Sequence, residues 1–185
     1  MPNYQGVWSL STQYQYNTDW QADNVSPARV AATIAARGLF HLGETANGNV
    51  NIIEQLNTVS AGNSTDFGDR TVAATAAGAL ASATRGVFAG GASNTNVVDF
   101  VTIASAGNAI DFGNLAAAAQ GTSGLSSATR GVFGGGYTND EINTIQYITI
   151  ANTGNTTDFG DLTQARYILS SCGSPTRGIF SGGLA

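Results

Sequence analysis

The sequence of 185 residues has no lysine, and only 10% of its residues are charged, against about a quarter in ordinary soluble domains. Seven arginines and 12 acidic residues give a net charge of −5. Asn, Thr, Ser, Gln and Gly must therefore carry most of the surface. A phosphate backbone would meet few cations on this chain, so we do not expect nucleic acid as a partner.

Cysteine, histidine and long apolar runs are also scarce. Cys172 is the only cysteine, which excludes an intrachain disulfide, and its strand-like surroundings predict a buried thiol. His41 is the only histidine and has no cysteine cluster beside it, so no zinc site is expected. No run approaches the roughly 18 apolar residues that span a bilayer, and the first eight residues do not resemble a secretory signal. We expect no membrane partner and synthesis in a cytoplasm.

A repeat dominates what is present. The motif Thr-Arg-Gly-Val-Phe-Gly-Gly-Gly begins at Thr129 and recurs at Thr84, at Thr176 and, more loosely, at Ala36. Its arginines are Arg37, Arg85, Arg130 and Arg177, spaced 48, 45 and 47 residues apart. A second motif, Asp-Phe-Gly, recurs at Asp66, Asp111 and Asp158. A period in this range is typical of propeller blades or solenoid units.

Each repeat can be divided into four short strands. In the last repeats these are residues 165–174, 176–183, 143–150 and 157–162, taken as first, second, third and fourth strands. A glycine pair ends the second strand, where it permits a tight turn with positive φ. The predicted fold class is therefore all-β.

The first strands at residues 72–81 and 116–124 are rich in alanine, and helix propensity favours a helix there as the alternative. Gly78, Gly121 and Gly124 oppose a helix, and small side chains suit the crowded innermost strands of a small propeller. We predict inner strands.

The two ends of the chain complement each other. Asp19 and Trp20 stand 47 residues before Asp66 and Phe67, and residues 6–15 read as a third strand, whereas the C-terminus stops after a second strand. The prediction is one domain, residues 1–185, forming a small β-propeller of four blades. Residues 28–70, 72–115 and 117–162 form three blades, and the half blade 165–185 is closed by N-terminal strands within residues 1–24. Alternatively, residues 1–24 are a separate anchoring segment.

The recurring charges invite a structural or a ligand-binding role. A repeated charge in a repeated frame is more often structural, and we expect this for Arg37, Arg85, Arg130, Arg177 and for Asp19, Asp66, Asp111, Asp158. The arginines would contact those carboxylates or turn carbonyls. A ring of ligand-binding charges is the alternative. The acidic turns lack the dense oxygen ligands of an EF-hand, so no metal or other cofactor is expected.

These motifs resemble kelch repeats, with Phe67, Phe112 and Phe159 in place of the kelch tryptophan and Trp20 keeping it. The Thr129 motif, together with the segment 147–166, more closely resembles kelch-like virion proteins of phages of marine cyanobacteria. The resemblance implies a β-propeller located on a virus particle and carries over no catalytic residue. It implies other virion proteins as partners, and residues 1–24 could then anchor the chain to the particle.

We therefore predict a non-enzymatic virion structural protein, a tail-fibre, appendage or capsid-decoration module without catalytic residues, acting as a homo-oligomer. Its variable loops, residues 44–49, 92–96 and 137–141, would meet a host glycan or a neighbouring subunit. Tyr137, Asn139, Asp140 and Glu141 are the candidate contacts, with a solvated hairpin tip as the alternative. The rival functions are a glycan-binding lectin-like module and a self-assembling filament or oligomer subunit.

Overall fold

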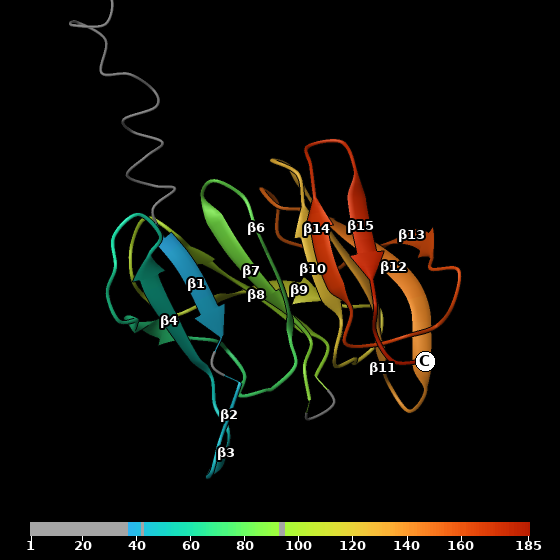
Figure 1. The fold of residues 1–185 in the computed structure, drawn as a ribbon, viewed down its shortest axis with the longest axis horizontal. Helices are drawn as coiled ribbons and strands as arrows, with labels where there is room; N and C mark the ends of the chain where they lie inside the picture. The colour runs from blue at the N-terminus through green and yellow to red at the C-terminus, as the bar shows by residue number, and fades with distance from the viewer. Residues whose placement is uncertain (1–36, 42, 93–94) are drawn as a thin grey trace, which may run out of the picture. The chain divides into compact units, whose positions relative to one another are not determined.

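The computed structural model describes residues 37–41, 43–92 and 95–185, which form only strands, turns and loops (Figure 1). The all-β prediction is confirmed for this part of the chain, and the helical alternative for residues 72–81 and 116–124 is wrong. Within these described ranges there is no helix long and apolar enough to cross a bilayer. Residues Arg37–Ala185 form one compact unit.

Each complete repeat forms its own antiparallel sheet, in which the four strands pair in chain order. Sheet 2 contains β6 (Gly78–Ala81), β7 (Arg85–Ala89), β8 (Val97–Thr102) and β9 (Ile110–Asn114). Sheet 3 contains β10 (Ser123–Ser126), β11 (Arg130–Tyr137), β12 (Glu141–Thr149) and β13 (Thr157–Asp161). The predicted second, third and fourth strands are therefore all present in these two repeats.

The outer two sheets contain fewer described strands. Sheet 1 contains β1 (Arg37–His41), β4 (Ile52–Asn57) and β5 (Thr65–Asp69), with the hairpin β2 (Glu44–Thr45) and β3 (Gly48–Asn49) inserted between β1 and β4. Sheet 4 contains β14 (Ser170–Gly173) and β15 (Gly178–Ser181). The predicted closing strands within residues 1–24, including Asp19, lie outside the described residues.

The first strands are shorter than predicted, because the residues before them bond to a neighbouring sheet. Ala76, Gly121 and Ile168 each stand two residues before a first strand and have φ of 52°, 66° and 55°. Gly121 N donates to Ala76 O at 2.7 Å, and Ile168 N donates to Gly121 O at 2.8 Å. This chain of backbone bonds links sheets 2, 3 and 4 where extended strands were expected.

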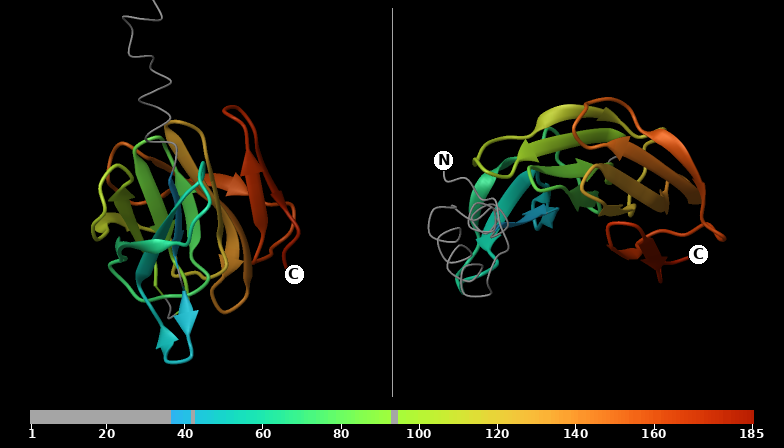
Figure 2. Two further views of the ribbon diagram at one scale, coloured as in Figure 1. Left: turned by 60° about the vertical axis from the view of Figure 1, so that its left-hand side comes forward. Right: turned by 90° about the horizontal axis from the view of Figure 1, so that it is seen from above.

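The core lies between neighbouring sheets, which follow one another in chain order (Figure 2). Successive side chains of a strand point to opposite faces of its sheet, so one strand contributes to the core on both sides. In β8, Val98 and Phe100 pack in a cluster shared with sheet 3, whereas Val101 packs in a cluster shared with sheet 1.

Cys172 is exposed, so its predicted burial is wrong. It occupies the position of Leu80, on a face of sheet 4 that no described element covers.

A loop of sheet 2 and the equivalent loop of sheet 3 also bond to the fourth strand of the sheet before them. Gly107 N donates to Phe67 O at 2.7 Å, and Asp69 N donates to the side-chain oxygen of Asn108 at 3.1 Å. Gly154 and Asn155 repeat both bonds on β9, at 2.7 and 3.0 Å. We call this arrangement the loop–strand contact.

The loop–strand contact explains the glycine of the Asp-Phe-Gly motif. Gly68 and Gly113 have φ of 146° and 148°, and a Cβ on either would overlap the carbonyl oxygen of Gly107 or Gly154. Close backbone approach therefore requires glycine here.

We expect Gly113→Ala to lower the free energy of unfolding by about 1–3 kcal/mol, because the added methyl group must push the Gly154 loop away from β9. Chemical denaturation measures the change. Gly48→Ala is the matched control, since Gly48 also has positive φ, 109°, but a Cβ there meets nothing within 4 Å. Equal losses in the two variants would mean that backbone strain, rather than the loop–strand contact, selects glycine.

Candidate functional site

The repeated arginines join neighbouring sheets through the carbonyls of turns. Arg37 Nη1 donates to Ile103 O and Arg85 Nη1 donates to Ile150 O, both at 2.7 Å. Each acceptor follows the third strand of the next sheet. The Arg85 guanidinium also lies 4.3 Å from the centre of the Phe100 ring. The turn-carbonyl alternative therefore describes these two arginines.

Asp66, Asp111 and Asp158 are exposed and form no ion pair with a described residue. The predicted contacts between the repeated arginines and these aspartates are therefore not formed, because the aspartates are exposed and the arginines lie at the interfaces between sheets. Arg130 sits 4.8 Å from the Tyr147 ring centre, but its guanidinium forms no hydrogen bond with a described residue. Arg177 is exposed.

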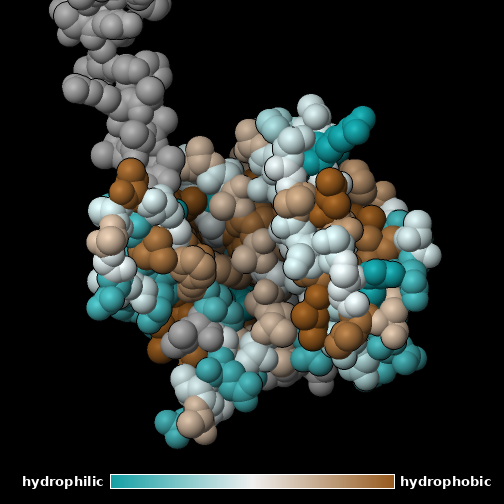
Figure 3. Space-filling view, viewed as in Figure 1, coloured by the Kyte–Doolittle hydropathy of each residue, from teal (hydrophilic) through white to brown (hydrophobic). Residues whose placement is uncertain are grey.

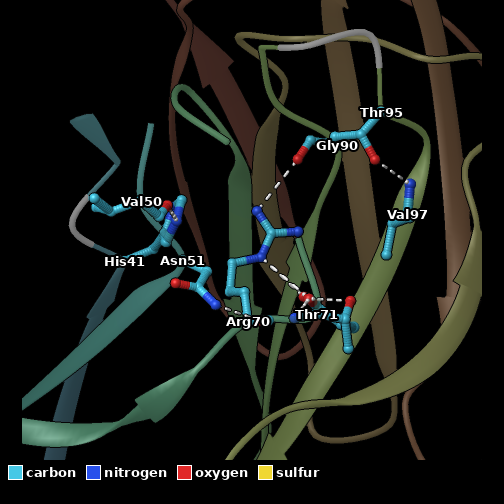
Figure 4. A network of polar contacts seen from close by, with 9 residues as sticks. His41, Val50, Asn51, Arg70, Thr71, Gly90, Thr95 and Val97 are labelled. Atoms are coloured by element: carbon cyan, nitrogen blue, oxygen red, sulfur yellow. Dashed lines mark hydrogen bonds and ion pairs between the residues drawn. The ribbon is translucent and has the colours of Figure 1, made fainter. Parts of the chain in front are cut away.

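The strongest electrostatic feature is a buried ion pair that sequence reasoning missed. Arg70 Nε lies 3.0 Å from Asp99 Oδ1, and both side chains have zero exposure. Thr71 donates to Asp99 Oδ2 from its backbone N and its hydroxyl, both at 2.9 Å. Arg70 Nη1 reaches Gly90 O at 3.3 Å (Figure 4). The pair therefore ties the end of β5 in sheet 1 to β7 and β8 in sheet 2.

An uncharged pair of residues occupies the equivalent positions between sheets 2 and 3. Leu115 occupies the position of Arg70, and the buried Gln146 occupies that of Asp99. Gln146 Oε1 accepts from Ala116 N at 3.0 Å and from the hydroxyl of Thr156. A signal for the ion pair was present in the sequence, because both charges interrupt positions that are uncharged in the following repeat.

His41 lies beside this network, in β1. Its Nε2 is 3.2 Å from Val50 O, and its ring centre lies 6.2 Å from that of Phe88. Burial disfavours the charged ring and lowers the pKa of His41 below 6.5, and the nearby positive charge of Arg70 lowers it further. His41 therefore lies at the interface between sheets 1 and 2 and is not displayed for contact with a partner.

The candidate contact residues lie on the hairpin that joins β11 and β12. Tyr137 pairs with Glu141 across it, and Thr138 N donates to Asp140 O at 3.0 Å. Asn139 and Asp140 are exposed at the tip. The Tyr137 ring is half-buried and lies 5.2 Å from the ring of Tyr167, centre to centre. The hairpin thus offers exposed polar groups at its tip, and Tyr137 is less available for contact than the sequence suggested.

Two second-to-third-strand connections share one end of the unit. The β2–β3 hairpin and the β11–β12 hairpin both lie at the lower end of Figure 1. Their lengths and sequences differ, whereas the strands that carry them repeat.

Within the described residues, no three His, Cys, Asp or Glu side chains gather closely enough to hold a metal ion. A scan against protein-family models gives no match, and a search of curated proteins gives none either.

We expect Arg70→Leu to lower the free energy of unfolding by about 3–5 kcal/mol, because Asp99 would remain buried without its partner. The double variant R70L/D99Q copies the Leu115 and Gln146 arrangement and should recover most of the loss. Denaturation of both variants beside the wild type measures this recovery. A double variant as unstable as R70L would show that the two interfaces do not share one design.

We expect the stability of the protein to fall as the pH drops below about 6.5, because unfolded chains then bind a proton that folded His41 resists. Its contribution is complete above the ordinary histidine pKa and is lost as the pH falls toward the lower folded value. The measurement is the free energy of unfolding between about pH 7.5 and 5.5. His41→Gln should flatten this dependence, and an unchanged slope would contradict the assignment.

Proposed function

We propose that this chain is a non-enzymatic structural protein of a phage virion, built as a kelch-like β-propeller that displays variable loops. The observation that carries the proposal is a repeated, cross-bonded frame whose second-to-third-strand connections vary and are exposed at one end. Loops held by a rigid scaffold are the usual place for contact residues. In the part of the chain that the structure describes, the buried pair of Arg70 and Asp99 joins sheets 1 and 2 and is not open to a substrate.

The propeller itself is supported by the order of strands and by the contacts between sheets. The arginine motif recurs four times at similar spacing, and sheets 2 and 3 each hold four short antiparallel strands in chain order, as blades do. Sheet 4 has described first and second strands only. We propose four blades, with residues 1–24 supplying the third and fourth strands of the last blade.

The displayed surface is polar and acidic, with Asp140 and Glu141 on one hairpin and Glu44 on the other. Asn139 and Asp140 offer amide and carboxylate groups that suit hydroxyl groups of a glycan, and Tyr137 with Tyr167 offers ring surface. A host-surface glycan or a neighbouring virion subunit is therefore the proposed partner, and the module would serve in a tail fibre, an appendage or a capsid decoration.

The test has two parts. Mass spectrometry and antibody labelling of purified particles should find the chain on the virion, and particles carrying N139A/D140A should adsorb to host cells at least tenfold more weakly. Thr129→Ala, at the opposite end of β11, is the matched control and should leave adsorption unchanged.

Absence of the chain from purified particles would contradict the proposal. Glycan binding by the chain without any particle would favour the lectin-like module, and ordered assemblies of the purified chain would favour the self-assembling subunit.

A further inference from the structure

The hairpin formed by β2 and β3 carries an asparagine followed by a glycine at its tip. Ala46 and Asn47 form the turn. Thr45 pairs with Gly48 across it. Asn47 is exposed, and Figure 3 shows the hairpin as a protrusion at the lower left with hydrophilic residues at its end. Water therefore has free access to the Asn47 side chain.

Asn47 differs from all the other asparagines of the sequence in the residue that follows it. Each of the others precedes a residue that has a side chain, whereas Asn47 precedes Gly48. A Cβ built on Gly48 would meet nothing within 4 Å. Neither a side chain nor a packed neighbour therefore keeps the Gly48 backbone nitrogen from the Asn47 side chain.

The Asn47 side chain also lacks the hydrogen bonds that hold asparagines elsewhere in the structure. The side-chain oxygens of Asn108 and Asn155 accept backbone N–H groups of a neighbouring sheet at 3.1 and 3.0 Å. The side-chain amide of Asn47 bonds to no described residue, and only its backbone N is engaged, with Thr45 Oγ1 at 3.2 Å. The side chain is therefore able to turn toward the next residue.

The hairpin itself is weakly held, because each of its strands has only two residues. A two-stranded hairpin alone is marginally stable in water, and such an element opens locally while the rest of the protein stays folded. Its first strand, Glu44–Thr45, is exposed, so little apolar burial opposes the opening. Opening allows the turn to reach the geometry in which the Gly48 nitrogen attacks the Asn47 side chain.

We infer that Asn47 is a site of spontaneous deamidation, with water as the co-reactant. The Gly48 backbone nitrogen gives up its proton and bonds to Asn47 Cγ, the Cγ–Nδ2 bond breaks, and the amide nitrogen takes up a proton and leaves as ammonia. Water then opens the five-membered cyclic imide at either carbonyl. The products carry an aspartate or an isoaspartate at position 47, and nothing is oxidised or reduced.

The modification changes the displayed end of the protein. It adds a negative charge to a chain of net charge −5, on the same hairpin as Glu44. Isoaspartate also lengthens the backbone by one atom, which disturbs the pairing of Thr45 with Gly48. The surface proposed for partner contact would therefore change with the age of the protein, although the chemistry itself does not depend on the virion proposal.

Peptide mass spectrometry of the folded full chain, kept in mildly alkaline buffer, tests this inference. Deamidation raises the mass of the peptide that contains Asn47 by about 1 Da, and detection of isoaspartate identifies the cyclic imide route. Asn139 is the matched control within the same molecule, because it is also exposed on a hairpin but precedes Asp140. We expect Asn47 to be modified at least roughly tenfold faster than Asn139, since glycine places no side chain in the way.

A variant and an unfolded sample complete the test. Gly48→Ala should slow the modification of Asn47 roughly tenfold, because its methyl group hinders the attacking nitrogen. The same chain unfolded in urea gives the rate without the hairpin. Equal rates at Asn47 and Asn139, or an unchanged rate in Gly48→Ala, would overturn the inference. It would also fail if the folded chain kept the Asn47 amide while the unfolded chain lost it, because the hairpin would then protect the site.

Discussion

The structure depends on hydrogen bonds between neighbouring sheets that repeat at equivalent positions. A sheet of four short strands buries too little apolar surface to be stable alone, so each must be covered by the next. The loop–strand contacts at Phe67 and Phe112 and the backbone bonds at Gly121 and Ile168 fix how the next sheet is placed. Glycines at close approach and the arginine-to-carbonyl bonds follow from this placement.

Within this repeated frame, one interface is distinguished by charge. The Arg70–Asp99 pair between sheets 1 and 2 has a neutral Leu115–Gln146 counterpart between sheets 2 and 3. A buried ion pair adds little net stability, but it penalises any arrangement in which one charge is left alone. The pair therefore favours the pairing of sheet 1 with sheet 2 over its pairing with another of the similar repeats.

Much of this was readable from the sequence. The repeat period, the glycine pairs and the Asp-Phe-Gly motifs predicted the second, third and fourth strands, because short-range turn chemistry and strand alternation determine them. The first strands were predicted too long, since nothing local shows that the backbone near Ala76 bonds to another sheet. The exposure of Asp66 and its equivalents was missed for the same reason, because a carboxylate partner for arginine can be judged only once the sheets are packed.

The candidate site was also predicted only in part from the sequence. The variable hairpin at residues 137–141 was found from the breaks in the repeat, but the packing of Tyr137 on Tyr167 depends on the following sheet. A hollow between sheets 3 and 4, lined by Leu125, Arg130 and Phe180 among others, could not be found without coordinates, because residues of two sheets form it.

The most direct test of the proposed closure is an experimental density map of the full chain at side-chain resolution. Our account predicts a closed propeller of four blades, in which β15 pairs with a third strand on the side away from β14. A map that shows an open arrangement of sheets, with β15 left at a free edge, would contradict it.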